Sequence, residues 1–186
     1  MVIHKQRIPF CDLSQLDEKS REMADRAKGP DGEVLNIFKT LLNHPKLVRA
    51  WGRFGNYILG GSTLSARERE LAILRIGWLN QAIYEWEQHV RIGKAAGITD
   101  AEVEQIKAGP KAGWSRHEAA IIQAADDLYE NSVVSDETWN TLAATYNRQQ
   151  MMDLVFSIGQ YNLVSWALNS FGVPLDPFLP GAQKNK

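Results

Sequence analysis

Helix start signals recur along this chain of 186 residues and constrain its fold more than any other feature. In a capping box, a Ser or Thr accepts a hydrogen bond from the third residue of the helix, and a Glu at that residue bonds back. The sequence predicts three capping boxes, formed by Ser65 with Glu68, Thr99 with Glu102, and Ser115 with Glu118. Another helix start is predicted at Ser135, because Ser is a preferred N-cap residue.

Helix stop signals and side-chain spacing complete this pattern. Gly97 follows one predicted helix, AGPKAG (residues 108–113) follows the next, and FGVPLDP (residues 171–177) follows the last. Apolar side chains in residues 147–172 recur at steps of three and four, which is the spacing of one helix face. No stretch alternates apolar and polar residues for long enough to predict a strand. We therefore expect an all-α helical bundle of about eight helices.

The N-terminal part of the chain gives weaker signals. We expect a charged helix near residues 13–27, ended by the turn sequence KGPDGE at residues 28–33. Residues 1–20 lack the apolar core of a signal peptide, so we expect a cytoplasmic protein. The length suits one domain with a substantial core, and we interpret residues 1–186 as a single all-helical domain with C-terminal helices at 116–170.

Composition and charge exclude two classes of partner. The chain is 44% hydrophobic and 23% charged, and its formal net charge is -1. No basic stripe of the kind that binds nucleic acid is present. No run of about 18 apolar residues predicts a membrane span. We expect a small-molecule substrate as partner, and no nucleic acid or membrane.

The stretch QAIYEWEQHV (residues 81–90) places ionisable groups on an otherwise apolar helix face. Glu85 and His89 are four residues apart, so they lie one turn apart on the same face. A short connection, GWLNQ at residues 77–81, joins this helix to the preceding one, so the two helices should pack as neighbours. Glu70 on the preceding helix then becomes a third candidate member of the site.

Two carboxylates beside one imidazole suit general acid–base chemistry. Burial raises the pKa of a carboxyl group, and a nearby carboxylate keeps an imidazole charged, so protons can be exchanged near neutral pH. The alternative is that Glu85 and His89 only solvate a helix face. Zinc requires three or four ligands, and His44 and His117 belong to other segments, so we expect no metal.

Three further residues are candidates for chemistry or binding. Cys11 is the only cysteine, so the chain has neither an internal disulfide nor a Cys-x-x-Cys pair, and its neighbours offer no group that would activate the thiol. Tyr57 and Arg75 are candidate substrate-binding residues. Arg75 suits a substrate carboxylate, and the alternative for Arg75 is a surface salt bridge.

The sequence around these residues resembles a known family. The segment 64–106, which contains RERE at 67–70 and YEWEQH at 84–89, closely resembles the carboxymuconolactone decarboxylase family, which includes the alkyl hydroperoxidase D proteins. The resemblance extends more weakly back to residue 43, so we take 43–106 as the family core. It implies an all-helical fold of the alkyl hydroperoxidase D-like type, built on a helical hairpin that forms homo-oligomers, either dimers, trimers or hexamers.

The chain departs from the hydroperoxidase branch of this family at its redox residues. That branch uses a Glu, a Cys-x-x-Cys pair and a His. The Glu aligns with Glu70 and the His with His89, whereas the two cysteines align with Ala82 and Glu85. The proton-handling positions match, but both sulfur positions are occupied by residues that cannot form a disulfide. A dithiol mechanism needs one thiolate to attack and a second thiol to resolve the product. We therefore expect that the protein is not a thiol peroxidase.

The resemblance to the decarboxylase branch implies a different chemistry. It favours a cofactor-free general acid–base lyase or isomerase that acts on a small carboxylated or lactone-like substrate, with Glu70, Glu85 and His89 as catalytic residues. Two alternatives remain open. One is a non-catalytic small-molecule-binding or stress-related protein that retains the fold, and the other is a peroxidase-related protein without the redox dithiol.

Overall fold

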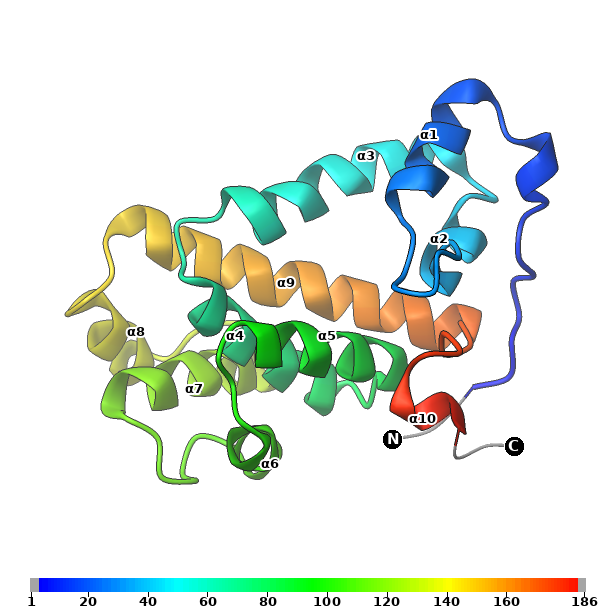
Figure 1. The fold of residues 1–186 in the computed structure, drawn as a ribbon. Coiled ribbons are helices and arrows are strands. Elements are labelled where there is room, and N and C mark those ends of the chain that lie inside the picture. The colour runs from blue at the N-terminus through cyan, green and yellow to red at the C-terminus, as the bar shows by residue number, and fades with distance from the viewer. Residues whose placement is uncertain (1–3, 184–186) are drawn as a thin grey trace.

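The structure, a computed structural model, describes residues 4–183, which form helices and contain no β-strand (Figure 1). The α-helices of this part are α1 (Glu18–Arg26), α2 (Asn36–Leu41), α3 (Pro45–Asn56), α4 (Ala66–Leu79), α5 (Ile83–Ala95), α6 (Asp100–Ala108), α7 (Arg116–Asn131), α8 (Asp136–Ala143), α9 (Arg148–Phe171) and α10 (Pro180–Gln183). A 3₁₀-helix, η1 (Leu13–Gln15), precedes α1, and a π-helix, η2 (Tyr57–Gly61), follows α3. The predicted all-α class is confirmed.

The N-terminal region differs from the prediction in its details. The single helix expected at residues 13–27 is two elements, η1 and α1, separated by the extended residue Leu16. Asp12 caps η1 and Asp17 caps α1, so each element has its own start signal. The structure has more α-helices than the expected number of about eight because of the short helices α2 and α10. Helix α2 has no side-chain cap, so no start signal for it is present in the sequence.

The predicted capping boxes are largely as expected. Two are complete, with both reciprocal hydrogen bonds: Ser65 with Glu68, and Thr99 with Glu102. At the third, the Ser115 hydroxyl accepts a hydrogen bond from the Glu118 backbone N–H but donates to the Glu118 carboxylate. Ser135 also caps its helix, by accepting from the Thr138 N–H.

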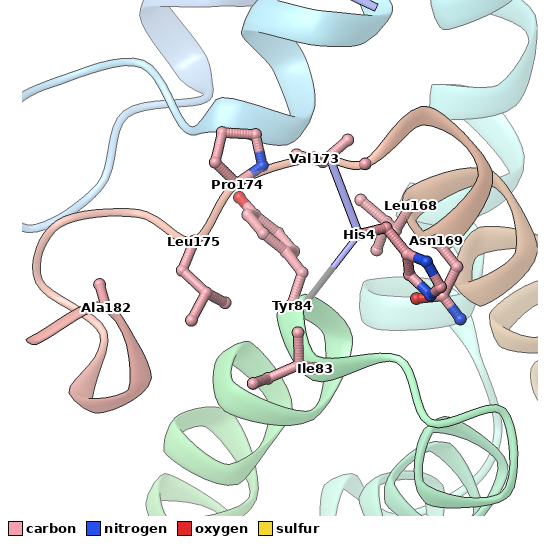
Figure 2. A pocket seen from close by; sticks show the side chains of 10 residues that line it. His4, Ile83, Tyr84, Leu168, Asn169, Val173, Pro174, Leu175 and Ala182 are labelled. Carbon is pink, nitrogen blue, oxygen red and sulfur yellow. The ribbon is translucent and has the colours of Figure 1, made fainter. Parts of the chain in front are cut away.

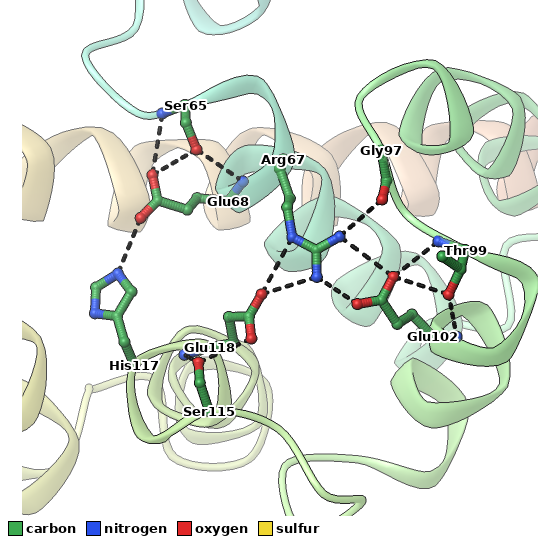
Figure 3. A network of polar contacts seen from close by, with 9 residues as sticks. All are labelled: Ser65, Arg67, Glu68, Gly97, Thr99, Glu102, Ser115, His117 and Glu118. Atoms are coloured by element: carbon green, nitrogen blue, oxygen red, sulfur yellow. Dashed lines mark hydrogen bonds and ion pairs between the residues drawn. The ribbon is translucent and has the colours of Figure 1, made fainter.

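The capping glutamates also connect three helix starts to one another (Figure 3). The Arg67 guanidinium lies between Glu102 and Glu118, with nitrogen–oxygen distances of 2.5 and 2.8 Å. Glu68 Oε1 lies 2.9 Å from Nε2 of His117. The beginnings of α4, α6 and α7 are therefore held together by the same side chains that cap them.

Helix α4 is the centre of the fold. It packs mainly against α5, α7 and α9, and every residue from Arg69 to Gly77 is buried. Helix α9 runs the length of the molecule, beside α3 on one side and the α4–α5 pair on the other (Figure 1). No helix within residues 4–183 combines the length and hydrophobicity needed to cross a membrane.

A tight turn and a glycine bring α5 against α4. Gln81 has a positive φ of 55°, and this left-handed residue reverses the chain between the two helices. On α5, a Cβ atom at Gly93 would lie 3.2 Å from Leu74 Cδ1 and 3.7 Å from Glu70 Cβ. The absence of a side chain at Gly93 therefore permits close packing of the two helices beside Glu70.

The C-terminal segment is fixed to the helices by one buried carboxylate. Asp176, which is 2% exposed, accepts hydrogen bonds from the backbone N–H of Asn36 at 2.7 Å, the Tyr84 hydroxyl at 2.5 Å and the Gln88 amide at 2.7 Å. These three donors belong to α2 and α5. Asp176 therefore joins the chain after α9 to both helices.

We predict that Asp176→Ala lowers the free energy of unfolding by about 2–4 kcal/mol, because it leaves three buried donors unpaired. Tyr84→Phe removes one of these bonds together with its donor and leaves one buried donor, the Ile37 backbone N–H, without the hydroxyl as acceptor, so its cost should be smaller, about 1–2 kcal/mol. Urea denaturation of both variants measures the difference. Equal costs would contradict the role of Asp176 as the shared acceptor.

Candidate active site

His89 lies between two glutamates inside the α4–α5 hairpin. Its Nδ1 is hydrogen-bonded to Glu70 Oε2 at 2.7 Å. Its Nε2 lies 2.9 Å from Glu85 Oε1 in an ion-pair contact whose geometry is not that of a hydrogen bond. The exposed fractions of Glu70, Glu85 and His89 are 0%, 4% and 5%. The structure thus brings the three candidate catalytic residues together and removes them from solvent.

The two carboxylates determine the protonation state of the imidazole. Burial by itself lowers the pKa of His89, but the negative charges of Glu70 and Glu85 and the hydrogen bond between the ring and Glu70 raise it from 6.5 to about 10. His89 is therefore an imidazolium at neutral pH. Its Nδ1–H is directed at Glu70, so the hydrogen on Nε2, beside Glu85, is the one available for transfer.

Two neighbours of this cluster were not identified from the sequence. The Tyr161 ring on α9 stands edge-on to His89, with ring centroids 4.6 Å apart. Burial and the charges of Glu85 and Glu70 raise the pKa of Tyr161 well above its ordinary value, so its hydroxyl stays protonated. Arg69 Nε lies 3.6 Å from the second oxygen of Glu70. The spacing of Tyr161 in the α9 stripe predicted a core residue, and nothing in it indicated contact with His89.

Several buried polar atoms near the cluster have no hydrogen-bond partner among the described residues. They include Glu70 Oε1, Glu85 Oε1 and Arg69 Nε. On α9 the hydroxyls of Ser157 and Ser165, one turn to either side of Tyr161, are also unpaired. Buried polar groups are nearly always hydrogen-bonded, so a set of unpaired ones marks a polar site rather than a passive core.

Tyr57 and Arg75, the candidate substrate-binding residues, do not join this cluster. The Tyr57 hydroxyl donates to Asp153 at 2.7 Å, next to η2. Arg75 forms a bidentate ion pair with Asp126, at 2.5 and 3.0 Å, and donates to two backbone carbonyls of α6. Arg75 is 8% exposed, so its ion pair is a buried one rather than the surface salt bridge that was its alternative. These contacts do not support substrate binding by either residue.

The cavities of the structure lie away from the cluster. One, of about 210 Å³, lies where the starts of α5 and α10 face the end of α9 (Figure 2). Its lining includes His4, Tyr84, Leu168 and Asn169. A second, of about 100 Å³, is a wholly apolar space between α3 and α9. Glu70, Glu85 and His89 line neither of these two cavities, and all three side chains are buried.

Neither a metal nor a thiol is indicated at the site. Within residues 4–183 no group of three His, Cys, Asp or Glu side chains has an arrangement that could hold a metal ion. Cys11 packs with α1 and α2 in a separate apolar cluster. Burial raises the pKa of its thiol, which disfavours the reactive thiolate.

The fold and the cluster define an all-helical protein with a buried Glu–His–Glu group on a helical hairpin. Residues 45–126, from the start of α3 through most of α7, match the carboxymuconolactone decarboxylase family. This segment, which contains the whole cluster, is similar to that family. Among curated proteins, none matches the chain.

Solved structures share the fold. The alkylhydroperoxidase AhpD core of an uncharacterized peroxidase-related protein from Ralstonia eutropha JMP134 superposes with a TM-score of 0.81 at 21% identity, covering 91% of this chain and 92% of that one. An uncharacterized peroxidase-related protein from Silicibacter sp. TM1040 gives a TM-score of 0.76 at 16% identity, covering 92% and 94%. At these identities, the similarity shows the all-helical AhpD-like fold alone.

We predict that His89→Ala lowers the free energy of unfolding by about 3–5 kcal/mol, because it leaves two buried carboxylates without their cation. Glu104→Gln removes an exposed carboxylate of α6 and should change stability by less than about 0.5 kcal/mol. Chemical denaturation at pH 7 compares the two variants. A similar small loss for both would show that the His89 ion pair is not buried in solution.

A pH prediction follows from the raised pKa of His89. Between its ordinary pKa of 6.5 and its folded pKa of about 10, the folded state binds one proton more than the unfolded state. This stabilisation is fully present below pH 6.5 and is lost as the pH rises to 10, with a slope of at most about 1.4 kcal/mol per pH unit. Unfolding curves from pH 6 to 10 measure it, and His89→Gln should remove this slope.

Proposed function

We propose that this protein is a cofactor-free acid–base enzyme, a lyase or isomerase that protonates carbon in a small carboxylated or lactone-like substrate. The observation that carries the proposal is the imidazolium of His89 between Glu70 and Glu85, out of bulk water. In such an environment an oriented cation stabilises developing negative charge far better than it does in water. The similarity of residues 45–126 to the carboxymuconolactone decarboxylase family supports the same chemistry.

A decarboxylation at this site has a simple balance of electrons and protons. The bond from the substrate carbon to its carboxylate breaks, carbon dioxide leaves, and the electron pair moves onto the conjugated carbonyl. His89 stabilises that charge and transfers its Nε2 proton to the carbon. Glu70, bonded to Nδ1, holds the ring in place and raises its basicity. Glu85, next to Nε2, returns a proton from solvent to the imidazole.

The unpaired polar atoms around the cluster support a polar ligand. Arg69 Nε is buried without a hydrogen-bond partner among residues 4–183, and its ion-pair contact with Glu70 is 3.6 Å long. A carboxylated substrate offers both an acceptor and a negative charge for this arginine. Neither of the two cavities reaches His89, so access requires displacement of the side chains that cover it. Tyr161, edge-on to the imidazole, is one of these covering groups.

The burial of the cluster favours a second candidate function. A protein that keeps the fold without the chemistry has no need of a route to His89, and its Glu–His–Glu group would serve only to hold α4 and α5 together. In that case the buried polar atoms that lack hydrogen-bond partners would bind no substrate. A peroxidase based on Cys11 has less support, because burial raises the pKa of that thiol.

We predict that the wild-type protein releases carbon dioxide, or loses conjugated absorbance, with at least one member of a panel of lactones, enol acids and 3-oxo acids. Glu70→Gln and His89→Gln should each lower kcat at least about 100-fold while the circular dichroism spectrum is retained, because each removes part of the proton relay. Glu104→Gln, on exposed α6 surface, is the control and should keep full activity.

The outcomes separate the two candidates. Turnover that survives His89→Gln overturns the catalytic assignment. No turnover by the wild type on any member of the panel supports the non-catalytic protein, in which the cluster only holds α4 and α5 together.

A further inference from the structure

The larger of the two cavities, of about 210 Å³, is bordered by segments from both ends of the chain (Figure 2). Its lining includes Tyr84 at the start of α5 and Leu168 near the end of α9. His4 of the N-terminal arm and Ala182 of α10 complete it. No residue of the Glu–His–Glu cluster lines this cavity, so a ligand bound here would occupy a second site.

The N-terminal arm that brings His4 to the cavity is fixed to the end of α9. The Arg7 backbone N–H donates a hydrogen bond to the Phe171 carbonyl at 2.8 Å. Gly172 has a positive φ of 64°, and a Cβ atom at this position would overlap the carbonyl oxygen of Lys5. Because only glycine fits where the arm crosses the chain, the position of His4 is part of the fold.

The opposite wall of the cavity is also held in place. Pro174 and Leu175 line it, and the Asn36 side-chain amide donates hydrogen bonds to both of their carbonyl oxygens at 3.1 Å. The next residue, Asp176, is the buried acceptor that joins this segment to α2 and α5. The cavity therefore has fixed walls, as small-molecule sites usually do.

The lining is mostly apolar, and no Lys, Arg, Asp or Glu within residues 4–183 contributes to it. Among its polar side chains, the Tyr84 hydroxyl already donates to Asp176, and the Asn169 amide nitrogen donates to the Asn80 carbonyl at 2.9 Å. The His4 imidazole and Oδ1 of Asn169 form no hydrogen bond with other described residues. Figure 2 shows these two side chains at the same side of the cavity, away from Ala182. The site thus offers one free donor and one free acceptor.

The size and the lining of the cavity select a class of ligand. An apolar cavity of about 150 Å³ holds benzene, so this one has room for a six-membered ring with a small substituent. A charged substituent would lose its hydration in a lining that supplies no Lys, Arg, Asp or Glu. A hydroxyl group accepts a hydrogen bond from the His4 N–H and donates one to Asn169 Oδ1, so it satisfies both free groups.

We propose that this cavity is a binding site for a neutral single-ring phenol or alcohol. The ring packs against Tyr84, Leu168 and Leu175, and the hydroxyl lies between His4 and Asn169. The site is separate from the Glu–His–Glu cluster, and the proposal is independent of the catalytic function.

The first test is an NMR titration of the full chain with phenol. The wild-type protein should bind one phenol with a Kd of about 1 mM or lower, and benzoate at least about 10-fold more weakly, because a carboxylate has no donor for Asn169. Ala182→Phe fills the cavity and should weaken phenol binding at least about 10-fold. Ala143→Phe, at an exposed alanine of α8, is the matched control and should leave binding unchanged. A wild type that binds no phenol, equal binding of benzoate, or unchanged binding in Ala182→Phe overturns the proposal.

The second test locates the probe. The phenol ring should shift the methyl signals of Ile83 and Leu175, which line this cavity and not the smaller apolar one. Shifts at Leu41 and Leu163 instead, which line only the smaller cavity, would place phenol there and contradict the assignment.

The third test concerns the hydroxyl group of the ligand. His4→Phe keeps a ring at the cavity but removes the N–H, so it should weaken phenol binding about 3–10-fold. His44→Phe, at another exposed histidine, is the control and should bind phenol as the wild type does. Phenol binding that is the same in His4→Phe as in the wild type would show that His4 does not hold the hydroxyl.

Discussion

The structure depends on keeping one imidazolium and its two carboxylates inside an otherwise apolar pair of helices. A buried charge is tolerated only when it is paired, so α4 and α5 must approach closely enough for Glu70 and Glu85 to contact the same ring. Gly93 permits that approach beside Glu70, and a Cβ atom at Gly77 would lie 3.8 Å from the Glu85 side chain. The hairpin turn and Gly93 thus permit the close approach that the pairing of these charges requires, whereas the contact at Gly77 would be an ordinary one.

Local signals in the sequence were sufficient for the helices from α4 to α9 and for placing Glu85 and His89 on one face, but not for α2 or α10. Caps such as Ser65 and Thr99 act within one helical turn, and the four-residue step from Glu85 to His89 fixes their common face. The short α4–α5 connection then predicted that Glu70 lies near Glu85 and His89. Arg75 and the Tyr161–His89 contact depend on how separate helices pack, which spacing within one helix does not determine. For the same reason the position of the two cavities away from the cluster was not foreseen.

Helix α9 links the interior of the molecule to its surface. Its inner face places Tyr161 against His89, and its outer face carries the exposed apolar side chains of Met152, Phe156, Leu163 and Trp166.

The glutamates that bond to N-cap residues also link the starts of α4, α6 and α7. As a result, acid and base destabilise different parts of this molecule. Burial alone would raise the pKa of Glu68 and of Glu118. Hydrogen bonds from Ser65 and His117 keep the pKa of Glu68 below 4.5, and those from Arg67 and Ser115 do so for Glu118. Arg67 lowers the pKa of Glu102 to about 2. Their stabilising effect is present above pH 4.5 and disappears on acidification. Each proton taken up then weakens both a bond to an N-cap residue and a link between helices. Acid should therefore loosen the corner where α4, α6 and α7 begin, whereas base should loosen the α4–α5 hairpin.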